Sequence, residues 1–179
     1  MDLAGVCSTI FLDGPFEVIP QFHASWDSVE AFAIFKLKTH PVLFIGVKSP
    51  SSFRLNSQRK EADRRIRGHF RDLHPDVIIP TVPAISAFGT LLSFYRYDKT
   101  SNSLTPAIEA DLPIMTDTAP KDRWDCDILD ATGTTRFREM ANEVKTMCTQ
   151  LLGGAANILG DLCIVLADLD LRSLKRPEK

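Results

Sequence analysis

The apolar positions in the first third of the chain follow the patterns of β-strands. Phe16–Phe22 alternates loosely around Pro20, which predicts an edge strand because proline donates no hydrogen bond to a ladder. Val29–Leu37 and Val42–Val47 are two apolar runs joined by the polar turn Lys38–Pro41. We therefore expect a β-hairpin whose second strand is buried on both faces.

Two later segments have the three- and four-residue spacing of helices with one apolar face. The first covers Leu55–Leu73, and its apolar stripe consists of Leu55, Ala62, Ile66, Phe70 and Leu73. The second covers Thr135–Leu152, where Gly153-Gly154 marks the C-terminal end. Its stripe consists of Phe137, Ala141, Val144, Cys148 and Leu151.

The segments around these helices are less regular. A strand is expected to begin at Asp76–Ile79 and another to cover Thr90–Tyr97, with an ordered loop over Leu104–Trp124. Leu3–Phe11 is a short apolar segment with helical character, and Ile158–Leu174 is compatible with a helix or a strand. The whole pattern predicts an α/β domain with a central mixed β-sheet flanked by the two long helices.

Length and charge limit the classes of protein that the chain can belong to. Its 179 residues suit one domain, which we expect over 1–153, with a leucine-rich extension over 154–179 packed on it. The net charge is −2, from 21 basic and 23 acidic residues. A basic field over the whole molecule is therefore excluded, and nucleic-acid binding would need a local patch.

Cysteines and apolar runs bear on the cellular compartment. The four cysteines form no CxxC pair, so a structural zinc site is not expected. The N-terminus lacks the basic segment of a secretory signal, and the longest apolar run, Leu162–Ala167, is far shorter than a membrane span. We expect a reduced intracellular protein, cytoplasmic or nuclear, that does not enter membranes.

Several stretches, in their order and spacing, resemble a family of small fungal proteins with the core of the PD-(D/E)XK nuclease fold. They are Asp27–Phe32, Pro41–Lys48, Ile85–Thr90 and Arg123–Leu129. The resemblance implies a restriction-endonuclease-like core of helix, three strands, helix and strand. In that superfamily an Asp near the start of the second strand and a Glu-x-Lys at the end of the third hold Mg²⁺ and contact the scissile phosphate.

The resemblance assigns three positions. Glu30 occupies the place of the family Asp, Lys48 that of the Lys, and Gly46 stands where the Glu of Glu-x-Lys belongs. A glycine offers no oxygen to a metal, so the acid set is incomplete. Glycine in a buried strand also occurs at bulges and at close packing. Among the Val, Ile and Phe around it, we interpret Gly46 as a lost functional side chain.

The residues also predict a shared site independently of the family. If the turn places Lys36 opposite Val42, Glu30 lies opposite Lys48 and Phe32 opposite Gly46. Directly opposed Cβ atoms are about 4.5–5.5 Å apart, so the acid and the lysine would touch. The alternative is a plain cross-strand ion pair at the end of the sheet.

A substitute acid is available on the helix that follows. Glu61 directly precedes the stripe residue Ala62, so it is a candidate to join Glu30 as catalytic residue and as ligand of Mg²⁺, which would be needed only if the protein is active. The alternative is a solvated acid that pairs with Arg65, four residues on.

The same helix carries the basic residues expected to contact nucleic acid, although such a run is also typical of a solvated face. They are Arg59, Lys60, Arg64, Arg67 and Arg71.

Two main hypotheses follow, beside a third possibility, a purely structural partner-binding protein with Ile158–Leu174 at an interface. One is a catalytically degenerate nuclease-fold protein, a pseudoenzyme, that binds nucleic acid or a protein partner, including a second copy of itself. The other is an active Mg²⁺-dependent nuclease that uses Glu30, Glu61 and Lys48. Gly46 favours the first, because one carboxylate holds Mg²⁺ poorly.

Overall fold

The computed structural model describes residues 15–25, 28–108 and 118–152. For residues 22–25 and 28–30 it describes the backbone alone. A seven-stranded mixed sheet has the order β1-β2-β3-β4-β5-β6, and β7 pairs with β5. The strands are β1 (Phe16–Ser25), β2 (Ser28–Leu37), β3 (His40–Lys48), β4 (Thr81–Phe88), β5 (Leu91–Asp98), β6 (Ser103–Thr105) and β7 (Cys126–Asp127). The helices are α2 (Asn56–Leu73) and α3 (Ala131–Leu151), with short 3-10 turns η1 (Pro50–Arg54), η2 (His74–Asp76) and η3 (Lys121–Arg123).

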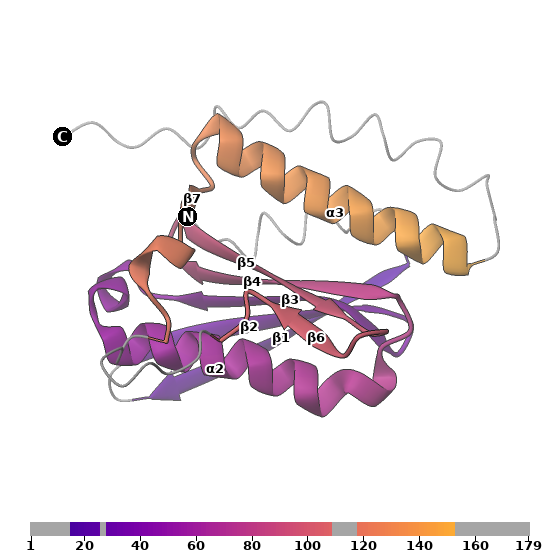
Figure 1. The fold of residues 1–179 in the computed structure, drawn as a ribbon, viewed down its shortest axis with the longest axis horizontal. Coiled ribbons are helices and arrows are strands. Elements are labelled where there is room, and N and C mark those ends of the chain that lie inside the picture. Colours follow the sequence, from indigo (N-terminus) through magenta and orange to yellow (C-terminus); the bar gives the residue numbers. More distant parts are fainter. Residues whose placement is uncertain (1–14, 26–27, 109–117, 153–179) are drawn as a thin grey trace.

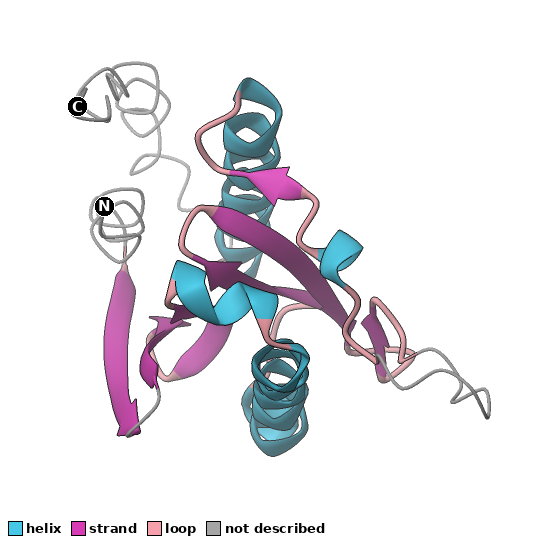
Figure 2. Ribbon diagram, turned by 90° about the vertical axis from the view of Figure 1, so that its left-hand side faces the viewer, coloured by secondary structure: helices cyan, strands magenta, loops and turns pink. Residues whose placement is uncertain are grey.

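The molecule has three layers, with α2 on one face of the sheet and α3 on the other (Figures 1 and 2). β1, β2 and β3 form an antiparallel meander, and α2 then crosses over so that β4 pairs parallel with β3. A parallel neighbour needs such a crossover, usually a helix. The expected mixed sheet flanked by two long helices is confirmed, and β1 stands first in the strand order, as expected of an edge strand.

The register of the hairpin agrees with the sequence analysis over its functional part. Glu30 is paired with Lys48, and Phe32 with Gly46. The expectation that Lys36 faces Val42 is wrong, because the register shifts between Phe35 and Lys36 and places Lys36 opposite Pro41. The irregularity lies next to the two-residue turn, so it leaves the pairs at the other end of the hairpin in register.

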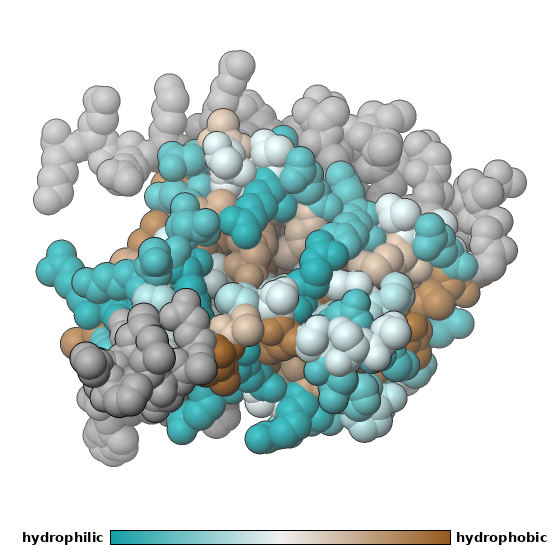
Figure 3. All heavy atoms as spheres, viewed as in Figure 1, coloured by the Kyte–Doolittle hydropathy of each residue, from teal (hydrophilic) through white to brown (hydrophobic). Residues whose placement is uncertain are grey.

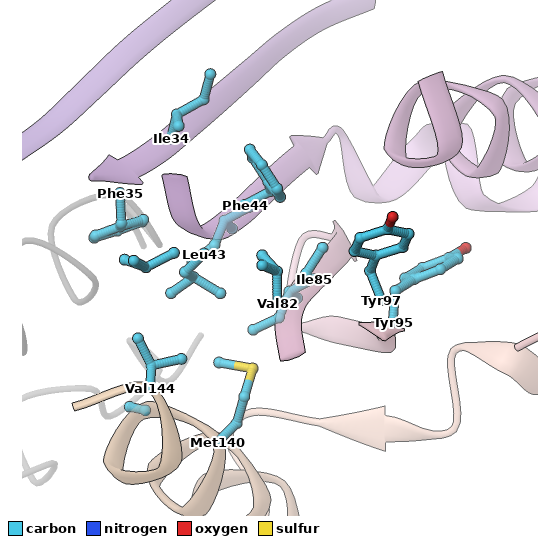
Figure 4. Close-up of a cluster of buried hydrophobic side chains, with 14 of the residues drawn as sticks. Ile34, Phe35, Leu43, Phe44, Val82, Ile85, Tyr95, Tyr97, Met140 and Val144 are labelled. Carbon is cyan, nitrogen blue, oxygen red and sulfur yellow. The ribbon is translucent and has the colours of Figure 1, made fainter. Parts of the chain in front are cut away.

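Alternation along the central strands divides the apolar side chains between the two helices. On the α2 side, Phe44 packs edge-on against Phe70, with ring centroids 5.1 Å apart. On the α3 side, Leu43 and Phe35 lie toward Val144, as Figure 4 shows. Both faces of β3 are therefore buried, and this strand carries the site.

Two segments differ from the sequence analysis. Asp76–Ile79 does not begin a strand: Asp76 ends η2, and the strand begins only at Thr81. Pro80 directly before β4, and Pro83 inside it, made this boundary hard to predict. The loop expected over Leu104–Trp124 contains part of β6 and the turn η3.

Other expectations fall on residues outside the described ones. They concern the segment Leu3–Phe11, the segment Ile158–Leu174, and the packing of 154–179 on the domain. In the described part of the chain, no helix has the length and apolar character of a membrane span.

Candidate functional site

Lys48 is the last residue of β3 and one of the most buried charged residues described, with 2 % of its surface exposed. Its Nζ donates a hydrogen bond to Gln58 Oε1 at 3.3 Å and lies 3.5 Å from Glu61 Oε2. We call Lys48, Gln58 and Glu61 the Lys48 cluster. A buried ammonium group needs such partners, because desolvation of an unpaired charge is costly.

The local fold explains why a strand end and the first turns of a helix meet here. The short turn η1 connects the end of β3 to the start of α2, so Gln58 and Glu61 in the first turns of α2 lie next to Lys48. Pro50 of η1 packs on Gly89, whose φ of 62° is a left-handed conformation; a Cβ there would lie 2.5 Å from Pro50 Cγ. The Gly89 amide also donates to the Lys48 carbonyl at 3.1 Å. The β4–β5 turn thus fixes both Lys48 and the start of the helix.

Glu30 shares this site by register. It occupies the position directly opposite Lys48 near the start of β2. Its side chain lies outside the described ones.

Gly46 is closely packed. A Cβ at this position would lie 3.2 Å from Cδ2 and 3.3 Å from Cε2 of Phe32, and 3.8 Å from Ile66 Cδ1 on α2. The other neighbour of the Phe32 ring is His69, stacked with its ring centroid 4.0 Å away. An aromatic ring on the next strand over a glycine is a known way to stabilise a sheet. The packing interpretation therefore has direct geometric support, because even a Cβ at this position would require the Phe32 ring to shift by a few tenths of an ångström.

Glu61 lies where a substitute acid would have to be. Its side chain is 37 % exposed, and its carboxylate points to Lys48. One oxygen of the Glu61 carboxylate contacts the buried Lys48, while solvent reaches the rest of the carboxylate. An acid that paired only with Arg65 on the same helix would not make this contact with β3.

The five basic residues of the expected nucleic-acid contact separate into two groups. Arg59 is only 3 % exposed, and its guanidinium donates to the carbonyls of Ala119 and Phe53 at 3.0 Å. Arg67 forms a double hydrogen bond with Asp63, at 2.7 and 3.0 Å, and a further bond to the Pro106 carbonyl. The expectation that Arg59 contributes to an exposed basic face is wrong, because its charge is used to hold loops against α2.

The remaining three are less buried. Arg64 and Arg71 are exposed and Lys60 is half-buried. The Arg71 side chain, 81 % exposed, pairs with the exposed Asp72 at 3.3 Å. We call Lys60, Arg64 and Arg71 the basic face of α2.

A buried polar network escaped the sequence analysis. Asp63 on α2 accepts hydrogen bonds from the Tyr95 hydroxyl and from Arg123 Nη1, both at 3.0 Å, besides those from Arg67. Burial and the neighbouring Asp63 carboxylate hold the pKa of Tyr95 above its usual value. Asp63 lies three residues before Ile66 on the apolar stripe, a spacing that could have indicated its burial.

Gln58 also escaped attention. It lies four residues before Ala62, so the stripe extends back through it toward the end of β3. The signal was present, but a glutamine at the start of a helix is common and usually solvated.

Among the described side chains, no group of three or more His, Cys, Asp or Glu is arranged to hold a metal ion. The Lys48 cluster contributes one carboxylate and one amide oxygen, and Mg²⁺ would need further oxygens, from Glu30 above all. The described part of the cluster by itself does not fit a Mg²⁺ ion, since its ammonium group lies against both oxygens.

In comparisons with protein-family models, curated proteins and solved structures, nothing matches this chain.

Proposed function

We propose that this protein is a catalytically degenerate relative of the PD-(D/E)XK nucleases that binds nucleic acid through the basic face of α2. The order of three antiparallel strands, helix and parallel strand agrees with the core that the resemblance implies. Glu30 near the start of the second strand and Lys48 at the end of the third stand at the positions expected of nuclease side chains. Both agreements support the proposal.

The packing around Gly46 favours loss of catalysis. The Phe32 ring lies close to the position from which the missing glutamate side chain would extend, and Lys48 is buried against Gln58 and Glu61. A lysine that is 2 % exposed does not reach a phosphate outside the protein unless its surroundings open. The cluster then acts mainly to join the end of β3 to α2.

Binding is tested with short single- and double-stranded DNA and RNA by fluorescence anisotropy at several salt concentrations. Neutralising Arg64 and Arg71 together, as Arg64→Gln/Arg71→Gln, is expected to weaken binding and to lower the salt slope on duplex DNA by about 2, from two lost phosphate contacts. Lys38→Gln/Lys121→Gln removes two exposed charges elsewhere and is the charge-matched control. An equal loss of nucleic-acid affinity in the two double variants would reject a specific role of α2.

One observation favours a second candidate, an active Mg²⁺-dependent nuclease. Glu61 Oε2 lies 3.5 Å from Lys48 Nζ and is half-open to solvent, as a relocated acid would be. Hydrolysis of the same nucleic acids with Mg²⁺ or Mn²⁺ decides between the two. The wild type is expected to cleave none of them. Cleavage by the wild type that is abolished both in Lys48→Ala and in Glu61→Gln would establish the second candidate instead.

Restoration of the missing acid needs two substitutions. Gly46→Glu alone would push the new side chain into Phe32, so the informative variant is Gly46→Glu/Phe32→Ala, with Phe32→Ala as its control. Metal-dependent cleavage by the double variant only would show a scaffold that retains the rest of a nuclease site.

A further inference from the structure

A cavity lies on the other face of the sheet from the Lys48 cluster. It has a volume of about 320 Å³, at the lower end of the usual range for small-molecule sites, about 300–1,000 Å³. Its walls are α3 on one side and β4, β5 and β6 on the other. In Figure 3, apolar residues are visible in a hollow between α3 and the sheet, with hydrophilic side chains around it.

The spacing of α3 residues places polar groups at one side of this cavity. Arg136, Glu139, Met140 and Glu143 recur at intervals of three and four, and all four line it. β5 contributes Phe94 and Arg96 from the opposite wall. β6 has only three residues, so the sheet is short at this end.

Two contacts hold the walls in place. The Arg136 guanidinium lies over the Phe94 ring, 4.4 Å from its centroid, so the pair presents the flat face of a guanidinium backed by an aromatic ring. Arg96 on β5 and Glu143 on α3 are joined by two parallel hydrogen bonds of 2.5 Å. The cavity is thus largely pre-formed.

The charges of the lining residues indicate the class of ligand. Two arginines and two glutamates balance one another, which disfavours a highly charged ligand such as a polyphosphate. Arg136 also lies 3.3 Å from Asp125, and Glu143 is bound by Arg96. Among the described residues, Glu139 has neither a hydrogen bond nor an ion pair, and its carboxylate is the available acceptor.

We propose that this cavity binds a neutral planar heterocycle with a ring N–H next to an amino group, the arrangement found on guanine. Two adjacent donors match the two oxygens of the Glu139 carboxylate, which accepts but does not donate. The flat ring would stack against the Arg136–Phe94 surface, as unpaired bases do on guanidinium and aromatic planes. Adenine and cytosine place an acceptor beside their amino group, which would face the carboxylate unfavourably.

The test uses the full chain and isothermal titration with guanosine, inosine, adenosine and uridine. Guanosine is expected to bind, and inosine, which lacks the amino group, to bind about tenfold or more weakly. Glu139→Gln should reduce guanosine binding by a similar factor, because the amide offers one acceptor in place of two. Glu17→Gln, the same substitution at an exposed position on β1, should leave it unchanged.

Phe94→Leu is the second variant, and it should weaken all nucleosides by loss of stacking. Circular dichroism checks that each variant is folded. A uridine hexamer with one guanine shows whether the natural ligand is a base in RNA or a free nucleoside. If the hexamer binds more tightly than guanosine and Glu139→Gln abolishes this binding, the ligand is an unpaired base in RNA. If both bind equally, the ligand is a free nucleoside. Absence of guanosine binding, equal binding of uridine, or binding insensitive to Glu139→Gln would each overturn the proposal. The nucleosides carry no phosphate for the basic face of α2 to contact, so the nucleoside results are independent of the proposed function.

Discussion

At the scale of single residues, Gly46 and Phe32 have the largest effect on what the site can do. Their side-chain positions face each other across the β2–β3 pair, and the ring of one uses the space left by the other. A strand of otherwise large apolar residues indicated only that Gly46 was unusual. That it serves close packing is visible only with Phe32 and Ile66 in place.

Gly46→Glu is therefore expected to destabilise the fold by about 2 kcal/mol or more, from overpacking and from a carboxylate set among apolar neighbours. Urea unfolding measures the change. Gly68→Ala is the matched control on α2: a Cβ there meets nothing within 4 Å, so it should stabilise by about 0.5–1 kcal/mol. A Gly46→Glu protein as stable as the wild type would contradict the packing described.

Cys148 gives a prediction for pH. It is buried against the sheet, and desolvation raises the pKa of its thiol from 9.0 to about 11. The thiol of the unfolded chain ionises at a lower pH than the thiol of the folded protein. The stabilisation of the folded state by the neutral thiol is therefore complete below pH 9 and is lost as the pH rises through 11. The loss approaches about 2–3 kcal/mol above the folded pKa.

Urea unfolding of the wild type and of Cys148→Ala between pH 8 and 11 tests this. The variant starts from a lower stability because it loses buried volume, but its decline with pH should be shallower. Parallel declines would show that Cys148 ionises as easily in the folded protein as in the unfolded chain.

At the scale of elements, α2 combines three tasks on one helix. Its apolar stripe packs on the sheet, its first turns hold Lys48, and its buried charges hold the chain on both sides of residues 109–117. Arg59 binds the Ala119 carbonyl, while Arg67 binds that of Pro106. A composition-based analysis counts all these arginines as surface charge, whereas two of them belong to the interior.

Arg59→Gln should therefore lower stability by about 2–4 kcal/mol, since buried carbonyls lose their donors. Arg64→Gln, an exposed arginine of the same helix, should change it by less than about 0.5 kcal/mol. Thermal unfolding of both variants gives the comparison. Similar small effects would mean that Arg59 is not needed to hold the loop.

At the scale of the whole molecule, the parallel pair β3–β4 lies between β2 and β5 in the sheet, and the helices lie on its two faces. Buried strands of this kind open only when the protein unfolds globally. The strands β1 and β6 stand at the two ends of the strand order.

Hydrogen exchange followed by NMR should thus find the slowest amides in residues 43–47 and 84–87, with exchange governed by global unfolding. Amides of β6 should exchange much faster, at rates insensitive to Gly46→Glu. Slow exchange in β6 equal to that in β3 would indicate that this end of the sheet is more protected than the structure shows.

Local patterns in the sequence determined the elements: the hairpin, both long helices, the edge strand with Pro20 and the mixed α/β class. The pairing of Glu30 with Lys48 came from an assumed hairpin register, and it holds although Lys36 faces Pro41, because the irregularity lies beyond these residues, next to the turn. Contacts between distant residues were decided only by tertiary structure: Phe32 over Gly46, Glu61 beside Lys48, Arg59 inside the protein, and the cavity beside α3. The reason is physical: periodicity fixes the face on which a side chain lies, whereas burial and partners depend on which elements pack against that face.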